Sequence, residues 1–153
     1  MVAQGQSWGR AKVIANSIGT DPNAGHLDHN SYEKDDETNW LNWDEKALNV
    51  DLVDYYRGMI AIRNTYADIR DVTPTARTFF LGSNPLSYGF SIGSKPNVLV
   101  LINANPKGSA KFKLPEGTWR ILANEKLAQL DALDQASDQA VVASQSGLLL
   151  VRS

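Results

Sequence analysis

Beyond residue 71 short apolar runs alternate with turn sequences, and no other feature limits the possible fold so strongly. The turns GSNP, GSKPN, NPKG and LPEG are rich in Gly, Pro and Asn, which favour chain reversal. The runs between them predict seven strands, over residues 78–81, 87–92, 98–103, 109–113, 118–123, 140–143 and 148–151. Six or seven short antiparallel strands at this spacing indicate a β-sandwich of about 80 residues.

Hydrophobic patterning distinguishes the strands of this region from one ambiguous tract. KFKL alternates apolar and charged residues, whereas VLVLI at 98–102 is continuously apolar, as expected for a strand covered on both faces. The tract LAQLDALDQASDQ, residues 127–139, fits either a short helix or a long connection between strands. A connection with one or two turns is the preferred interpretation.

An amphipathic helix is predicted before the strands. DLVDYYRGMIAIRNTY, residues 51–66, has a 3.6-residue apolar period over about four turns, and Asn49 is the predicted N-cap. Its predicted apolar face consists of Leu52, Val53, Tyr56, Met59, Ile60 and Ile62. Gly58 lowers helix propensity by about 1 kcal/mol relative to alanine, which indicates close packing against a neighbour. The helix needs a partner to bury this face.

Residues 1–48 show neither a helical nor a strand period. GTDPNAGHLDHNSY, residues 19–32, is dense in Gly, Pro, Asn and Asp, a composition typical of loops. An irregular tract of this length is unusual in a compact domain unless it is functional or detached from its scaffold.

Composition and motifs exclude several kinds of function. The chain has no cysteine, which excludes disulfides, a thiolate nucleophile and cysteine-ligated zinc. A net charge of −2 over 153 residues gives no electrostatic basis for a nucleic-acid partner. Neither a GxSxG nucleophile elbow nor a glycine-rich phosphate loop is present.

Metal binding is not favoured by the sequence. His26 and His29 lie three residues apart in a loop without a third convergent ligand, a pattern typical of solvated histidines. DHNSYEKDDE, residues 28–37, lacks the ligand spacing and central glycine of an EF-hand, so a hydrated acidic loop is preferred over a calcium site. No cofactor is predicted for this chain.

Membrane segments are not predicted either. No apolar run approaches the roughly 20 residues that span a bilayer. The first 19 residues lack the charged region and apolar core of a signal peptide. We therefore expect a soluble chain without a membrane partner, and the sequence leaves its compartment open.

Aromatic and amide side chains are interleaved in the loop-rich part. Sugar rings stack on aromatic faces, while Asn and Asp side chains bond to sugar hydroxyl groups. The side chains that fit this chemistry are Trp8, Asn30, Tyr32, Asn39, Trp40, Asn42 and Trp43. Alternatively, the tryptophans fix the loop to a hydrophobic wall. That alternative is preferred for Trp43, which lies near the helix start, and it stays open for Trp40.

Three stretches resemble a known family. NSYEKDDETNWLNW, residues 30–43, resembles the N-S-Y-N-x-x-D-x-x-N-x-I-D-W stretch of type I pullulanases and related glycoside hydrolases of the α-amylase superfamily. DYYRGMIAIRNTYADIR, residues 54–70, resembles the family helix D-Y-Y-K-G-L-I-A-L-R-K-x-H-P-A-F-R. QGQSWGRAK, residues 4–12, is similar to the G-E-E-F-L-R-T-K loop after the eighth barrel strand. The positions that match in the first stretch are Asn30, Ser31, Tyr32, Asp36, Asn39 and Trp43.

The resemblance implies a mainly β chain: an antiparallel β-sandwich of the amylase C-terminal type, preceded by a loop-rich segment and one amphipathic helix from the end of a (β/α)8 barrel. Residues 1–70 would be the barrel remnant, with the strand-8 loop and helix 8, and residues 71–153 the sandwich. Loops after barrel strands form the active-site rim. The resemblance therefore implies that Asn30 and Tyr32 contact sugar, with Asp28, Asn39 and Trp40 as further substrate-binding candidates.

The implied partners are the rest of the barrel and, through the parent enzyme, an α-glucan or maltooligosaccharide. The family's G-x-R-x-D nucleophile motif, later Glu acid and late His-Asp pair are absent, and Ser7 stands where the family has the second Glu of G-E-E. The parent is expected to cleave α-glucosidic bonds by retaining double displacement, and this chain to hydrolyse nothing alone. Whether the parent requires calcium is left open.

Two other functions remain possible: a module that binds glucan on surface aromatics, and a purely structural domain, which is preferred over the module. The aromatics of residues 72–153 sit mostly in strand patterns that suggest a core: Phe79, Phe80, Tyr88, Phe90, Phe112 and Trp119. Glucan binding that is lost on Trp119→Ala would favour the module.

Overall fold

The computed structural model describes residues 4–16, 21–28, 30–32, 34, 36–71, 73, 76–93 and 95–153. The chain divides into two compact units, Met1–Val53 and Asp54–Ser153, here called unit 1 and unit 2. This division falls inside a helix. The boundary predicted after residue 70 separates barrel-like from sandwich-like sequence, and it stays a prediction.

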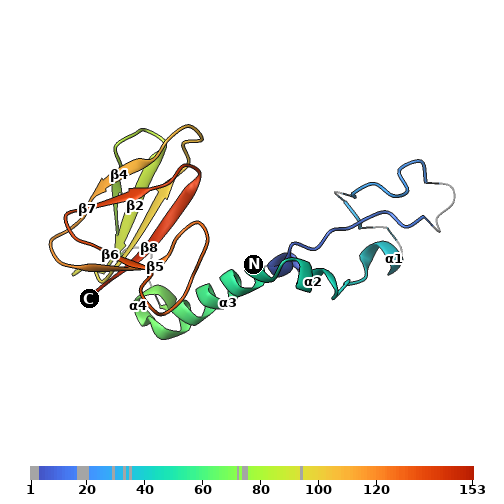
Figure 1. The fold of residues 1–153 in the computed structure, drawn as a ribbon, viewed down its shortest axis with the longest axis horizontal. Coiled ribbons are helices and arrows are strands. Elements are labelled where there is room, and N and C mark those ends of the chain that lie inside the picture. Colours follow the sequence, from blue (N-terminus) through green and yellow to red (C-terminus); the bar gives the residue numbers. More distant parts are fainter. Residues whose placement is uncertain are drawn as a thin grey trace. The chain divides into compact units, whose positions relative to one another are not determined.

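Unit 1 is loop-rich, as its sequence predicts. Its complete regular elements are the short η1 (Gln6–Trp8), α1 (Asp36–Asn39) and α2 (Glu45–Leu48) (Figure 1). Between η1 and α1 the chain reverses, and Val13 and Leu27 form an isolated antiparallel bridge. The unit ends in the first turn of α3 (Val50–Thr65).

Unit 2 is an antiparallel β-sandwich, which confirms the predicted fold class (Figure 1). One sheet contains, in spatial order, β1 (Arg77–Leu81), β2 (Ser87–Ile92), β3 (Val98–Asn103), β8 (Ser146–Arg152), β5 (Trp119–Ala123) and β6 (Asp134–Ala136). The other sheet pairs β4 (Ala110–Lys113) with β7 (Gln139–Val142). All seven predicted strands are present, with ends within two residues of their predicted positions.

Two apolar cores cover the two faces of the six-stranded sheet. The core between the sheets contains Leu99, Leu101, Ala110, Phe112, Leu114, Trp119, Ala140, Val142, Leu148 and Leu150. The core on the opposite face contains Ile62, Ile92, Val98, Leu122, Ala123, Ala128, Leu149 and Val151, with Tyr55, Tyr66 and Ile69 of the helical segment packed against it. Successive side chains of β3 therefore enter different cores, which explains why VLVLI is continuously apolar.

The tract 127–139 is a connection, as preferred from the sequence, but it also contains a short strand. Residues 134–136 form β6, which pairs with residues 119–121 of β5 and was missed in the sequence. This strand has three residues, two of them polar and exposed, so no apolar alternation marks it. Asn124 organises the turn that starts the connection, because its Oδ1 accepts the N–H groups of Lys126 at 2.8 Å and Leu127 at 2.9 Å.

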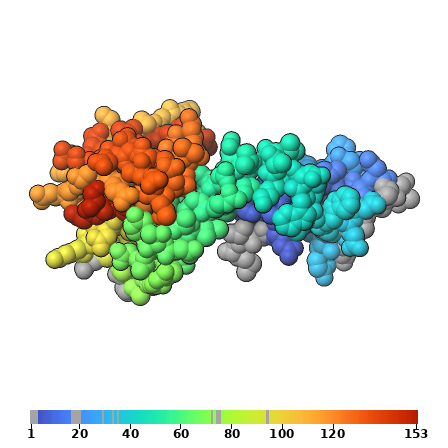
Figure 2. All heavy atoms as spheres, turned by 60° about the horizontal axis from the view of Figure 1, so that its bottom comes forward, coloured from blue at the N-terminus to red at the C-terminus, as the bar shows by residue number. Residues whose placement is uncertain are grey.

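The unit 2 part of helix α3 packs closely on this connection (Figure 2). A Cβ atom added to Gly58 would lie 1.7 Å from the carbonyl oxygen of Ala128, which confirms the predicted close approach. Nearby, the Tyr55 hydroxyl donates to the Asn124 carbonyl at 2.9 Å. Burial, and to a lesser degree Glu125, raises the pKa of Tyr55.

One expectation for α3, side-chain capping by Asn49, was wrong. The Asn49 carbonyl accepts the Val53 N–H at 3.1 Å, but its side chain donates to the Glu45 carbonyl instead of capping α3, because α2 ends immediately before it. The broad apolar face is not buried as a whole. Only Ile62 is fully buried along the helix, whereas Ile60 is 56% exposed. The exposed side still needs a partner.

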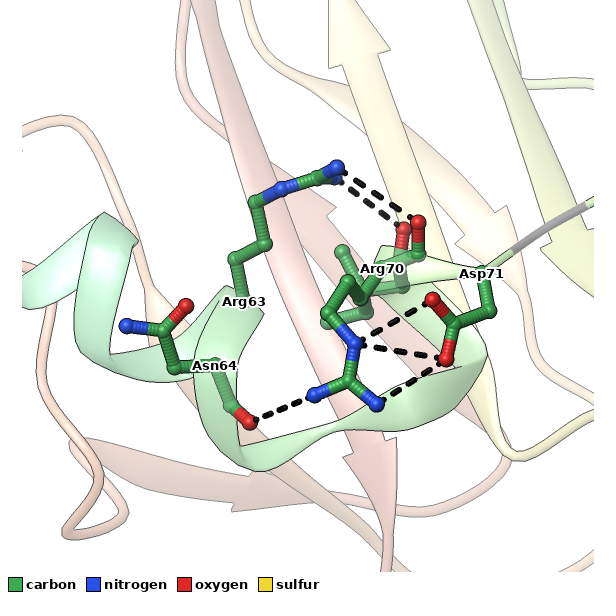
Figure 3. Close-up of polar contacts among 5 residues, drawn as sticks. Arg63, Asn64, Arg70 and Asp71 are labelled. Atoms are coloured by element: carbon green, nitrogen blue, oxygen red, sulfur yellow. Dashed lines mark hydrogen bonds and ion pairs between the residues drawn. The ribbon is translucent and has the colours of Figure 1, made fainter.

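Polar contacts close the end of the helical segment, where α4 (Ala67–Arg70) follows α3 (Figure 3). The Arg63 guanidinium donates to the carbonyls of Ile69 and Arg70, both at 3.4 Å. Arg70 donates to the Asn64 carbonyl at 3.2 Å and to the Asp71 carboxylate at 2.9 Å. The hydrogen bonds that the Asp71 carboxylate accepts from Arg70 lower the pKa of Asp71. The last carbonyls of the helices thus gain partners that an unassisted helix end lacks.

A buried asparagine joins the ends of the two sheets. The Asn103 Nδ2 group donates to the carbonyls of Gly108 at 2.9 Å, Ala143 at 2.8 Å and Val142 at 3.3 Å. Its Oδ1 accepts the Asn105 N–H at 3.1 Å. Since β3 belongs to one sheet and residues 108–143 include the strands of the other, this side chain links the layers.

We expect Asn103→Leu to lower the free energy of unfolding by about 2 kcal/mol, because it retains the side-chain volume but leaves buried carbonyls without a donor. Urea denaturation followed by far-UV circular dichroism measures this loss. Asn64→Leu is the matched control, since Asn64 is exposed, and its effect should stay within about 0.5 kcal/mol. Equal midpoints for the two variants would contradict a linking role for Asn103.

In the part of the chain that the structure describes, none of the helices has the length and apolar character required to cross a membrane.

Candidate functional site

The candidate site is the loop around residues 30–43, which charged side chains of residues 10–12 hold in place. Arg10 donates through Nη2 to the carbonyls of Asn39 and, at 2.7 Å, Trp40. Lys12 donates through Nζ to the Ser31 hydroxyl and, at 3.4 Å, to the Asn39 side-chain oxygen. These contacts join residues 19 to 30 positions apart in the sequence. Neither Arg10 nor Lys12 was predicted as a site residue, although both lie in the stretch 4–12 that resembles the family loop.

Asn39 lies at the centre of this network. Its Nδ2 group donates to the carbonyls of Ser31 and Lys34, both at 3.0 Å. Since a side-chain amide has two N–H donors, both are used inside the loop. Its Oδ1 accepts the bond from Lys12. Among the described residues, Asn39 is therefore a predicted sugar contact whose side-chain nitrogen and oxygen both already bond within this chain.

The aromatic residues of the loop fall into two groups. Trp8 is buried, and its ring centroid lies 4.9 Å from that of Trp43, which is itself 62% exposed. Tyr32 is 86% exposed and Trp40 is 68% exposed, and neither has a ring contact of this kind among the described residues. These two rings have the exposure that stacking on a sugar ring requires.

An open hollow of about 580 Å³ lies in the same unit, and its lining includes Gln4, Gln6, Arg10, Lys12, Leu27 and Asp28. Asp28 Oδ1 accepts the Asn30 N–H at 2.9 Å, which connects the hollow to the loop. Asp28 Oδ2 and Arg10 Nε are buried without a hydrogen-bond partner among the described residues. Buried polar atoms of this kind are normally satisfied by a water molecule or a ligand.

The metal hypotheses gain no support from the described residues, among which no three His, Asp or Glu side chains converge. His29, Glu33 and Asp35 lie outside the described residues. Asp21 instead pairs with Lys34 at 2.6 Å, and this hydrogen bond lowers the pKa of Asp21.

The aromatics of the sandwich are only partly core residues. Phe112 and Trp119 are fully buried, as predicted, whereas Phe79 is 65% exposed and Tyr88 also lies at the surface. Because Trp119 lies between the sheets, Trp119→Ala cannot report on surface binding, and Tyr88 is the proper position for that test.

Comparison of the structure with solved proteins identifies the fold. The pullulanase from Bacillus acidopullulyticus matches 97% of this chain with a TM-score of 0.71 and 24% sequence identity. This chain has the fold of part of a pullulanase. A pullulanase from Anoxybacillus sp. LM18-11, complexed with maltotetraose, matches at TM-score 0.69 and 18% identity, and the type I pullulanase from Bacillus subtilis str. 168, complexed with maltose, at 0.64 and 20%. Both alignments also cover 97% of this chain.

The pullulanase match extends over both units and is not confined to the sandwich, since it includes all but 3% of the chain. The chain spans only 18% to 20% of the length of these pullulanases. No protein-family model and no curated protein sequence matches it.

Proposed function

We propose that this chain is the C-terminal part of an α-glucan-acting glycoside hydrolase, in which unit 1 supplies a rim of the glucan cleft and the sandwich supports the barrel. The observation that carries the proposal is the pullulanase fold over 97% of the chain, combined with the loop that resembles the family motif. The chain alone is not catalytic, because the motifs with the nucleophile and the acid are absent from its sequence.

The rim would bind glucan through its exposed rings and nearby polar groups. Tyr32 and Trp40 offer apolar ring faces to sugar C–H groups, while Asn30, two residues before Tyr32, is exposed and would bond to sugar hydroxyl groups. Asp28 Oδ2 would accept a hydroxyl hydrogen at the hollow. Two neighbouring pullulanase structures contain maltotriose and maltotetraose, which suggests oligosaccharides of this kind as test ligands.

The proposed barrel partner would cover apolar surface that unit 2 leaves exposed. Met59 and Ile60 of α3 border a hollow of about 280 Å³ that also reaches Leu149 of the sheet. On the same face of the sheet, Phe79 pairs with Phe90 and Leu81 with Tyr88 across the β1–β2 ladder. Exposed apolar surface next to a buried core is typical of an interface.

Nuclear magnetic resonance of the four tryptophan indole N–H groups tests the rim directly. On titration with maltotetraose we expect the Trp40 signal to shift with about millimolar affinity, which corresponds to about −4 kcal/mol. The Trp119 signal is an internal control, since this side chain is fully buried and its N–H donates to the Pro115 carbonyl at 2.9 Å. Tyr32→Ala should abolish the Trp40 shift.

Other outcomes separate the alternatives. Binding that survives Tyr32→Ala but is lost in Tyr88→Ala would favour a glucan-binding sandwich module. If the Trp40 signal does not move at about 10 mM maltotetraose, a roughly 50-fold excess over the protein, the proposed rim would be contradicted. Release of reducing ends from pullulan by the chain alone would contradict its assignment as non-catalytic.

A further inference from the structure

Asn39 was expected to contact sugar, but the structure occupies its polar atoms differently. Both of its N–H donors bond to backbone carbonyls of the loop, and its oxygen accepts from Lys12. Either N–H group could donate to a sugar hydroxyl only by giving up its carbonyl, which leaves a second bond to the side-chain oxygen as the remaining direct contact. An internal role therefore fits Asn39 better than a ligand contact.

The three side chains connect the loop at complementary points. Arg10 donates to the two consecutive carbonyls of Asn39 and Trp40, while Lys12 donates to the Ser31 hydroxyl. Asn39 then ties the Trp40 end of the loop to the Ser31 carbonyl. Tyr32 follows Ser31 in sequence and Trp40 follows Asn39, so the fixed backbone positions adjoin the two exposed rings.

Neighbouring contacts leave the two cations little freedom. A Cβ atom on Gly5 would lie 2.6 Å from the Arg10 Cδ atom, so the glycine makes room for the arginine stem. The Ala11 N–H donates to Glu45 Oε2 at 3.3 Å, and the Ala15 N–H donates to the buried Thr38 hydroxyl at 3.3 Å. The segment that bears Arg10 and Lys12 thus also bonds to Thr38 of the loop and to Glu45 of α2.

We propose that Arg10, Lys12 and Asn39 are positioning residues, which hold the Tyr32 and Trp40 rings apart and outward and do not themselves contact the glucan. This inference rests on the function proposed above. A loop that is held in its binding conformation binds more tightly, since apparent affinity falls in proportion to the fraction of chains in that conformation.

Hydrogen exchange in the chain without ligand tests the positioning. The reporters are the Lys34 N–H, which donates to the Ser31 carbonyl at 3.2 Å, and the Trp40 N–H, which donates to the Asp36 carbonyl at 2.7 Å. We expect Lys12→Met and Asn39→Ala each to accelerate their exchange about ten-fold, since each removes bonds that hold the loop closed. Lys12→Arg, which keeps a cationic donor, should restore slow exchange.

Titration of the same variants with maltotetraose supplies a second measurement. The Trp40 indole shift should require about ten-fold more ligand in Lys12→Met and Asn39→Ala, and about the original amount in Lys12→Arg. Lys46→Met is the matched control, since Lys46 is exposed on α2, and it should change neither exchange nor titration.

The outcomes distinguish this inference from the proposed function. Unchanged exchange in both Lys12→Met and Asn39→Ala would overturn the positioning role. Weaker binding in Asn39→Ala with unchanged exchange would make Asn39 a sugar contact and likewise overturn it. Absence of any maltotetraose response in the unmodified chain would contradict the glucan rim, while exchange would still decide whether these residues position the loop.

Discussion

Trp119→Ala should remove a large part of the stability of the sandwich. Trp119 is fully buried between the two sheets, and its indole N–H donates to the Pro115 carbonyl at 2.9 Å. The Arg152 guanidinium covers the ring at 4.8 Å from its centroid. Truncation of a buried aromatic side chain costs about 3–5 kcal/mol, a large fraction of the about 5–15 kcal/mol by which native domains are stable. Urea denaturation followed by far-UV circular dichroism measures this loss.

Two variants make this result specific. Trp40→Ala is the same substitution at an exposed position of unit 1, and we expect it to change the unfolding free energy by about 0.5 kcal/mol or less. Trp119→Phe retains most of the apolar volume but loses the N–H donor, so its expected cost is smaller, about 1–2 kcal/mol. If Trp119→Ala unfolded at the same urea concentration as Trp40→Ala, the described core would be wrong.

The sandwich was predictable from the sequence because its pattern is local. Most of its strands are apolar runs between Gly-, Pro- and Asn-rich turns, and β3 is continuously apolar because both of its faces are covered. β6 was not predictable in this way. Its three residues pair with β5 through backbone bonds, which any sequence can make, and its side chains are too polar and too few to show a period.

The candidate site was only partly predictable, because its important contacts are long-range. The sequence pattern of aromatic and amide residues indicated Tyr32 and Trp40, which are exposed in the structure. Arg10 was missed, since it bonds to carbonyls 29 and 30 residues away and nothing in the local sequence shows where the loop returns. The bonds from Asn39 to the Ser31 and Lys34 carbonyls were not predictable either, because an amide in a loop has the same sequence appearance whether its donors bond to sugar or to the backbone.

The exposed face of α3 shows what a helical period leaves unspecified. The helical period correctly predicted an apolar helix, but a period does not state which apolar residues meet a partner. Ile62 is buried against the sheet, whereas Ile60 stays exposed. The period therefore includes apolar residues that point in two directions. Those on one side pack against unit 2, and the proposed barrel would cover those on the other side.

Gly58→Ala should destabilise unit 2 although alanine is the better helix former. Helix propensity alone would stabilise the variant by about 1 kcal/mol. The new methyl group, however, would lie 1.7 Å from the carbonyl oxygen and 2.5 Å from the carbonyl carbon of Ala128. These are backbone atoms that cannot rotate away, so the helix and the connection must separate, which also strains the hydrogen bond from Tyr55 to the Asn124 carbonyl. We expect a net loss of about 3 kcal/mol, at the upper end of overpacking costs.

Gly108→Ala is the matched control for this collision, because a Cβ atom there meets nothing within 4 Å. Its effect should be neutral or stabilising by up to about 1 kcal/mol, through the reduced entropy of the unfolded chain. Gly58→Ala should therefore lower the urea midpoint, whereas Gly108→Ala should leave it unchanged or raise it, although the chemical change is identical. A higher midpoint for Gly58→Ala would mean that local propensity outweighs the contact with Ala128, and that the helix does not pack on the connection as described.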